Sequence, residues 1–174
     1  ESTTGTAQTT GESFPDVMND FYARGGNAYF YAYAGVDAGA IADQKTIAEW
    51  VQSSTENKAQ AMFMTTDPNA VLNTATSDIG YQLRNTSMER SSVIYHPTGM
   101  VNGVDMTGQR PDAAILGRML WTDPGAQQWD YKTLTTASDS GLSPTEQNNL
   151  RAKGYNFVET FTNTTFTHLF KGRT

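Results

Sequence analysis

The stretch KAQAMFMTTDP, residues 58–68, decides the fold class of this chain. It is a short apolar run, and Asp67-Pro68 ends it with a turn signal. A run of this length between turn residues predicts a buried strand. Two more strands are predicted on either side of it, at NAYFYAYAGV, residues 27–36, and at RSSVIYHP, residues 90–97.

Helical patterns separate these strands. Residues 41–54 place apolar side chains on one helical face, and residues 70–86 do so less clearly because Gly80 interrupts them. A helix is also predicted before the first strand, where Ser13 and Asp16 have the spacing of a capping box. Strands that alternate with helices are typical of a parallel sheet.

The third quarter of the chain is less regular. Residues 98–111 are rich in turn residues and too polar for a helix or strand. Asp112 is predicted to cap a helix over residues 113–120, and the turn at residues 123–125 ends it. A half-buried strand is then predicted within residues 127–134, because aromatic residues alternate there with polar ones.

The last quarter carries the clearest local signal. Ser143-Pro144-Thr145-Glu146 combines an N-cap serine, a proline at the first helical position and the glutamate of a capping box. Gly154 is placed to end that helix. Residues 155–163 and 164–172 then predict two strands that pair as a hairpin.

These elements predict one α/β domain, with a largely parallel or mixed sheet flanked by helices and a β-rich C-terminal end. We assign residues 13–174 to this domain and residues 1–12, which are polar and aperiodic, to a flexible lead-in. No linker or internal repeat divides the chain of 174 residues.

Composition excludes several partners. The formal net charge is −6, whereas a nucleic-acid footprint or an anionic membrane contact requires a basic surface. No apolar run approaches the about 20 residues that span a bilayer. Cysteine is absent, so disulfides and cysteine metal sites are excluded.

Four polar residues are expected at the strand ends, where open α/β sheets bind ligands. They are Asp37, Asp67, His96 and Lys132. Two acids and a lysine could imitate the set with which receiver-like domains hold Mg²⁺ and a phosphoryl group. The first strand end offers only one acid, however, and turn and cap roles explain the same residues.

Other chemical patterns are weaker. NTSM, residues 85–88, echoes part of a subtilisin-like nucleophile stretch, but Ser87 precedes His96 and the order of acid, histidine and serine fails. His96 and His168 have no partner pattern for a metal. GVDAG, residues 35–39, lacks the third glycine of a dinucleotide fingerprint. We therefore predict no catalytic, cofactor-binding or metal-binding residues.

The stretch GRMLWTDPGAQQWDYKTL, residues 117–134, places two tryptophans around a turn. We expect Trp121 and Trp129 to pack into the core rather than to stack on a ligand, because one such ring removes on the order of 150–250 Å² from water. Arg118 is interpreted as a surface or inter-subunit ion-pair residue.

Residues 90–172 resemble the contractile tail sheath proteins of myovirus-type bacteriophages. The resemblance is carried by a strand ending in Tyr95-His96, a helix leading to Gly117-Arg118, a Pro-Gly turn and the Lys-Thr-Leu of residues 132–134. A late helix whose end reads as Lys, then Asn or a related residue, completes the pattern. Residues 27–68 fit the same family more loosely.

The resemblance implies a structural virion protein rather than an enzyme. In that family, subunits form hexameric rings that stack helically around the tail tube above a baseplate, and contraction drives the tube into the host. The protein is made in the host cytoplasm. Terminal arms link subunits by strand addition. The chain stops before such arms, so we expect a core fragment that is monomeric alone.

Two other functions stay open at this stage. One is a small-ligand or phosphoacceptor α/β domain of the receiver-like kind. The other is a secreted binding or adhesion module, which the many Thr and Asn residues suggest.

Overall fold

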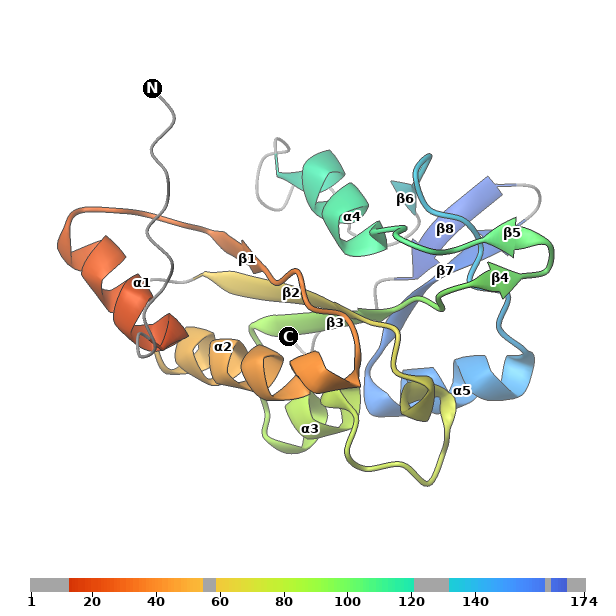
Figure 1. Ribbon diagram of the computed structural model, residues 1–174, viewed down its shortest axis with the longest axis horizontal. Helices are drawn as coiled ribbons and strands as arrows, with labels where there is room; N and C mark the ends of the chain where they lie inside the picture. Colours follow the sequence, from red (N-terminus) through yellow and green to blue (C-terminus); the bar gives the residue numbers. More distant parts are fainter. Residues whose placement is uncertain (1–12, 55–58, 121–131, 162–163, 169–174) are drawn as a thin grey trace.

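A mixed sheet of six strands forms the centre of the computed structural model, which describes residues 13–54, 59–120, 132–161 and 164–168 (Figure 1). The strand order is β1-β2-β3-β7-β8-β6. The first four strands in this order are parallel, and β8 pairs antiparallel with both β7 and β6. The strands are β1 (Phe30–Ala32), β2 (Gln60–Thr65), β3 (Ser91–Tyr95), β6 (Lys132–Thr133), β7 (Asn156–Phe161) and β8 (Thr164–His168). The predicted α/β class is confirmed.

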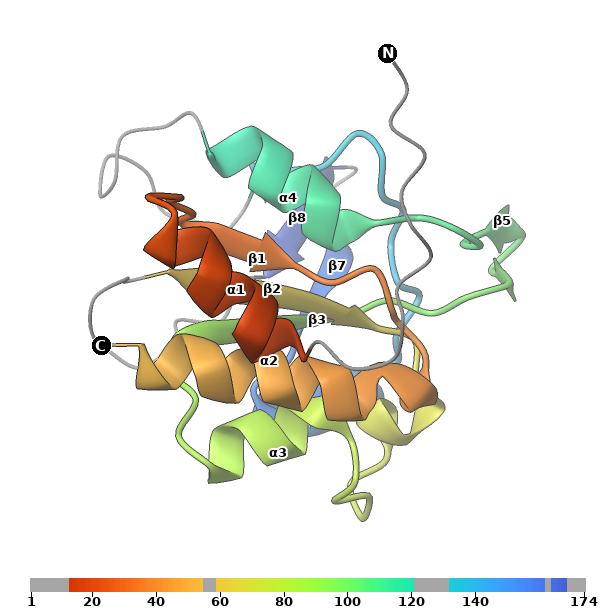
Figure 2. The same cartoon turned by 60° about the vertical axis from the view of Figure 1, so that its left-hand side comes forward.

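Helices cover both faces of this sheet. Figure 2 shows α2 and α3 on one face and α4 on the other. The α-helices are α1 (Phe14–Ala23), α2 (Ile41–Ser53), α3 (Ile79–Asn85), α4 (Pro111–Met119) and α5 (Pro144–Lys153). Two short 3-10 helices, η1 (Ala38–Ala40) and η2 (Pro68–Val71), follow the ends of β1 and β2. The result is three layers, which bury the central strands from both sides.

Strand β2 is the inner strand that the sequence predicted. Its side chains alternate between two cores, as the period of a strand requires. Phe63 lies in the core under α2, α3 and α5, whereas Met62 packs with α4 side chains such as Ile115. Both faces of β2 are therefore apolar, which explains the unbroken apolar run at this position.

Helix α1 is attached through aromatic rings. Phe14 meets the rings of Tyr31 and Trp50 edge-on, and the Tyr22 ring stacks on Trp50. The indole Nε1 of Trp50 also donates to Asn19 Oδ1 at 3.1 Å. No residue of α1 is fully buried, and these partly buried aromatic rings pack the helix against β1 and α2.

The capping predictions at Ser13, Ser143 and Gly154 are confirmed. The side chains of Ser13 and Ser143 each accept a hydrogen bond from the backbone N–H three residues later, at Asp16 and Glu146. In return, the carboxylates of Asp16 and Glu146 accept from the backbone N–H of the two serines. Gly154 ends α5 with φ at 83°, a left-handed conformation that glycine adopts without steric cost.

Three predicted boundaries are wrong. Residues 70–86 do not form one helix, because η2 ends at Val71 and α3 begins only at Ile79. Residues 98–111 contain a short hairpin of β4 (Met100–Val101) and β5 (Val104–Asp105), although they are polar. The first strand is confined to Phe30–Ala32 within the predicted range 27–36.

The start of α4 also differs from the prediction. Arg110 is the N-cap and Pro111 the first helical residue, so Asp112 lies inside the first turn and does not cap. Proline suits that first position because its missing N–H would have no partner there. Of the strand predicted within residues 127–134, Lys132–Thr133 is described as β6. Trp121, Trp129 and the turn between them lie outside the described residues.

The Ser143 cap can be tested by substitution. Ser143→Ala removes the acceptor for the Glu146 N–H and should lower the free energy of unfolding by about 1 kcal/mol, as N-cap losses do. Ser143→Asp keeps an acceptor and should stay within about 0.5 kcal/mol of the parent. Urea denaturation measures both. An unchanged midpoint for Ser143→Ala would mean that the cap contributes nothing to α5.

Candidate functional site

Asp37 and Asp67 lie after the carboxyl ends of β1 and β2, as predicted, but each caps a short helix. Asp37 Oδ1 accepts from the Ala40 N–H at 3.2 Å at the start of η1. Asp67 Oδ1 accepts from the Asn69 N–H at 3.0 Å at the start of η2. Both carboxylates therefore have structural partners in their own turns.

Two other buried polar side chains close the same edge of the sheet. Gln44 of α2 donates from Nε2 to the carbonyl oxygens of Gly35 and Met64, at 3.0 and 2.9 Å. The guanidinium of Arg110 forms a bidentate ion pair with the carboxylate of the fully buried Asp112. Neither cluster was singled out by the sequence. The partners of Gln44 are backbone oxygens distant along the chain, and Asp112, although only two residues from Arg110, was interpreted as a helix cap.

Arg110 also reaches the segment after β1. Its Nη1 donates to the Ala34 carbonyl at 3.0 Å and its Nη2 to the Tyr33 carbonyl at 2.9 Å. The hydrogen bond to Asp112 raises the pKa of Arg110. One side chain thus ties the start of α4 to the end of β1, across the position where an α/β domain usually admits its ligand.

The fourth predicted strand-end residue, Lys132, is not brought to these acids. Its backbone lies in β6, and the strand order places β3, β7 and β8 between β6 and β2. At about 4.8 Å per strand, four steps across the sheet amount to roughly 19 Å between the backbones. The arrangement therefore does not support a phosphoacceptor set made of Asp37, Asp67 and Lys132.

His96 follows β3 and is completely buried. Its Nδ1 lies 3.2 Å from Ser140 Oγ, and its Nε2 has no hydrogen-bond partner in the part of the chain that the structure describes. Burial lowers the pKa of the imidazole, while Gln109, Asp112 and Asp139 act in the opposite direction. We conclude that His96 is a neutral packing group beneath the loop that carries Ser140.

Ser87 and His96 do not approach each other. Ser87 precedes the amino end of β3 and His96 follows its carboxyl end, so five strand residues, at about 3.3 Å each, separate them. Ser87 has a φ of 55° at the end of α3, where Met88 N–H bonds to the Leu83 carbonyl as in a helix-terminating turn. His168 belongs to β8, and its side chain lies outside the description.

Arg118 forms a contact that the sequence did not predict. Its Nη1 donates to the backbone carbonyl of Thr133 at 2.9 Å, which ties the end of α4 to β6. The Gly-Arg and Lys-Thr-Leu stretches that carry the family resemblance are therefore neighbours in space.

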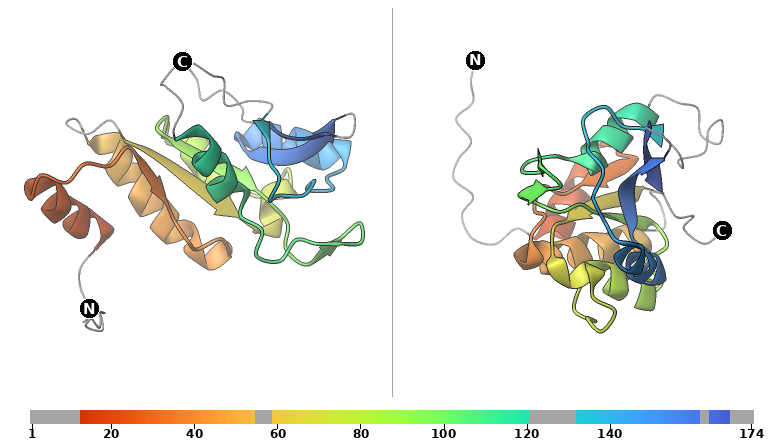
Figure 3. Two further views of the ribbon diagram at one scale, coloured as in Figure 1. Left: turned by 90° about the horizontal axis from the view of Figure 1, so that it is seen from above. Right: turned by 90° about the vertical axis from the view of Figure 1, so that its right-hand side faces the viewer.

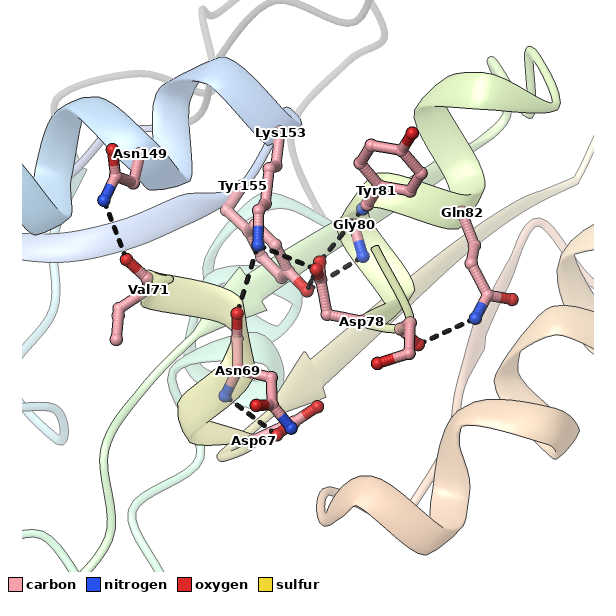
Figure 4. Close-up of polar contacts among 11 residues, drawn as sticks. Asp67, Asn69, Val71, Asp78, Gly80, Tyr81, Gln82, Asn149, Lys153 and Tyr155 are labelled. Carbon is pink, nitrogen blue, oxygen red and sulfur yellow. Dashed lines mark hydrogen bonds and ion pairs between the residues drawn. The ribbon is translucent and has the colours of Figure 1, made fainter. Parts of the chain in front are cut away.

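The most extensive buried polar cluster centres on Asp78, which the sequence analysis did not single out (Figure 4). Its carboxylate accepts from Lys153 Nζ at 2.8 Å, from the Tyr155 hydroxyl at 2.7 Å and from the Tyr81 N–H at 3.0 Å. Lys153 Nζ donates to the Asn69 carbonyl as well, at 3.1 Å. The cluster links η2, α3 and the junction of α5 with β7.

Tyr155 completes the cluster. Its hydroxyl accepts from the Gly80 N–H at 2.8 Å, and its ring lies where a Cβ at Gly80 would be, so only glycine fits there. Burial and the Asp78 carboxylate raise the pKa of Tyr155 strongly, so the phenol stays protonated. A protonated, fully bonded tyrosine beside a paired lysine lacks the features of a nucleophile or general base.

A cleft of about 570 Å³ lies on the opposite, amino edge of the sheet. It runs between the ends of α3 and α5. The lining includes apolar side chains (Leu83, Met88, Val93) and charged ones (Arg84, Glu89, Arg151, Lys153). It contains no histidine.

Comparisons with protein-family models, with curated proteins and with solved structures give no significant match to this chain. Within the described ranges, no three His, Cys, Asp or Glu residues are grouped so as to hold a metal ion. No helix among these residues has the length and apolar character to cross a membrane.

Removal of Asp78 should destabilise the domain strongly. Asp78→Ala leaves the buried Lys153 ammonium unpaired, and breaking one partner of such a pair costs about 3–5 kcal/mol. Asp16→Ala is the matched control, since it removes an exposed carboxylate from the first turn of another helix and should cost about 1 kcal/mol. Equal losses for both variants in urea denaturation would contradict the role given to Asp78.

His96 should make stability depend on pH. Because its pKa is lower in the folded chain, the unfolded chain binds more protons, so stability is full above about pH 6.5 and falls as the pH drops below that value. His96→Gln should flatten this part of the profile. Denaturation midpoints between pH 7.5 and 5 measure it, and parallel profiles for both chains would show that His96 does not titrate differently on folding.

Proposed function

We propose that this chain is the core of a structural subunit of a contractile bacteriophage tail sheath and that it has no catalytic activity. The observation that carries the proposal is the occupied edge of the sheet. Most polar groups at the carboxyl ends of the parallel strands bond to neighbouring turns and to one another, as the two caps, the Gln44 amide nitrogen and the Arg110–Asp112 pair illustrate. Among the described residues, the buried atoms Gln44 Oε1 and His96 Nε2 are exceptions that have no hydrogen-bond partner.

The resemblance adds the specific assignment. The described parts of the stretches that carry it lie on β3, α4, β6, α5 and β7, which follow in this order along the chain with β4 and β5 between β3 and α4. The contact of Arg118 with Thr133 gives two of these stretches a shared structural role. A core of this kind would contact other subunits in hexameric rings and helical stacks, together with the tail tube and the baseplate.

The physical character of the interior is consistent with such a role. A sheath subunit must keep its shape while its contacts change during contraction. Buried polar groups that are fully paired favour one arrangement over alternatives, because any other packing would leave charges without partners. The Asp78 cluster has this property.

Electron microscopy of the complete gene product tests the proposal. We expect tubes or stacked hexameric rings at micromolar concentration, and monomers for residues 13–174 alone. The same preparations should be assayed for Mg²⁺-dependent incorporation of acetyl phosphate and for binding to glycan arrays. Absence of rings and tubes, combined with saturable phosphorylation or glycan binding, would reject the structural role in favour of one of the alternatives.

A further inference from the structure

We propose that residues 138–141 form a strap over the domain that opens when His96 is protonated. Opening of the strap uncovers one edge of β7 and removes a support of the β4–β5 hairpin. The inference goes beyond the proposed function and does not depend on it, because it concerns a movement within one copy of the chain.

The strap belongs to the segment that joins β6 to α5, and it runs between the hairpin and β7 (Figures 1 and 3). The register pairs β3 with only the first two residues of β7. Beyond them, the Ser140 N–H donates to the Val158 carbonyl at 2.9 Å, and Ser140 Oγ accepts from the Val158 N–H at 3.3 Å. The Asp139 carboxylate accepts from the Thr160 N–H. The strap therefore covers the part of the β7 edge that extends past β3.

The other side of the strap supports the hairpin. The Ser138 N–H donates to Gln109 Oε1 at 2.7 Å, and Gln109 Nε2 donates to the carbonyl of Asp105, the last residue of β5, at 2.9 Å. Gly141 lies so close to Val101 of β4 that a Cβ at the glycine would overlap it. A two-stranded hairpin is marginally stable by itself, so we expect its order to depend on these contacts.

The strap is held by polar contacts alone. Its sequence, Ser-Asp-Ser-Gly, has no apolar side chain, and none of its residues belongs to either apolar core. Ser138 and Asp139 are partly exposed and Gly141 is exposed. Surface segments with few apolar contacts open locally at a lower free energy than the core does. The strap can therefore leave β7 while the domain stays folded.

His96 lies beneath the strap and is completely buried. Its Nδ1 lies 3.2 Å from Ser140 Oγ, and the hydroxyl can serve a neutral ring as either donor or acceptor. A charged ring carries a proton on both nitrogens. Its Nε2 proton would then have no acceptor among the residues that the structure describes. Because a buried charged donor without an acceptor is costly, protonation favours the open strap, which admits water.

The charged groups around His96 do not remove this cost. Asp112 and Asp139 attract a charged ring, but Arg110 neutralises Asp112, and Asp139 already accepts from two backbone N–H groups. Strands β2 and β3 have no charged residue, the one on β7 forms an ion pair of its own, and Asp105 of the hairpin is exposed. Burial outweighs the attraction and lowers the pKa of His96.

The opening equilibrium should therefore depend on pH with a definite magnitude. In the open strap, water reaches His96, and the pKa of a hydrated imidazole is about 6.5. Because the closed strap keeps the ring neutral, only the open form gains a proton as the pH falls. The equilibrium constant for opening should then rise about tenfold between pH 7.5 and pH 5.5.

Native-state hydrogen exchange of the 174-residue chain measures this opening. After correction for intrinsic rates, the Ser138 and Ser140 amides should exchange roughly a hundredfold faster than the Phe63 amide, which requires global unfolding. The exchange of both serine amides should rise about tenfold from pH 7.5 to pH 5.5. The Met106 amide, which bonds to the Gly99 carbonyl at the base of the hairpin, should rise with them.

Two variants assign the effect to one histidine. His96→Gln keeps an acceptor for the Ser140 hydroxyl but cannot gain a proton, so the tenfold rise should disappear. His168→Gln removes the only other histidine of the chain and should leave the rise in place. The second variant decides the question even if His96→Gln does not fold, because His96 is then the only histidine that can titrate.

Three results would overturn the proposal. Exchange of Ser138 and Ser140 at the rate of Phe63 would show that the strap opens only with the whole domain. Fast exchange that does not change with pH would show that the strap moves without exposing His96. Loss of the rise in His168→Gln would assign the titration to the wrong histidine. An unchanged Met106 amide would overturn the link to the hairpin.

Discussion

Asp78 is the residue on which the rest of this structure most depends. Its carboxylate receives the Lys153 ammonium, the Tyr155 hydroxyl and the first-turn N–H of Tyr81, all within a region closed to water. A buried carboxylate is tolerated only when its charge is compensated and its oxygens are bonded. The compensating groups come from α3 and from the α5–β7 junction, which are more than seventy residues apart in sequence. The position of α5, and with it the register in which β7 joins β3, is therefore coupled to the turn that starts α3.

Buried polar groups are also compensated at the carboxyl ends of the parallel strands, the edge at which α/β domains often bind ligands. Here Arg110 bonds to Asp112 and to two backbone carbonyls, and Gln44 bridges the ends of two strands. These bonds engage most of the polar groups at this edge, whereas Gln44 Oε1 and His96 Nε2 have no hydrogen-bond partner among the described residues. Exposed apolar side chains lie instead on the β4–β5 hairpin and on the outer face of α1, as Met100 and Phe21 illustrate.

The sequence predicted those features that depend on neighbours in the chain. The Ser143 cap, the Gly154 terminus and the buried β2 all follow from local spacing and apolar patterning, and all are confirmed. Features set by distant partners could not be predicted in this way. Gly80 weakened the prediction of a helix, yet its lack of a Cβ is what admits the Tyr155 ring. The hairpin at residues 100–105 was missed because its strands are only two residues long and lie in a polar, turn-rich segment, although Asn102-Gly103 is a recognisable turn pair. Asp112 was predicted as a cap, but Arg110 is the cap and Pro111 starts the helix two residues earlier than predicted.

Native-state hydrogen exchange of the Gly80 amide tests the central claim most directly, because this N–H is bonded to Tyr155 within the Asp78 cluster. If the cluster is a structural tie, the Gly80 amide should exchange only through global unfolding. Its opening free energy should then equal that of the Phe63 amide in the centre of β2. Exchange of Gly80 through a local opening several kcal/mol easier than that of Phe63 would contradict the account, since the cluster would then open to solvent without loss of the fold.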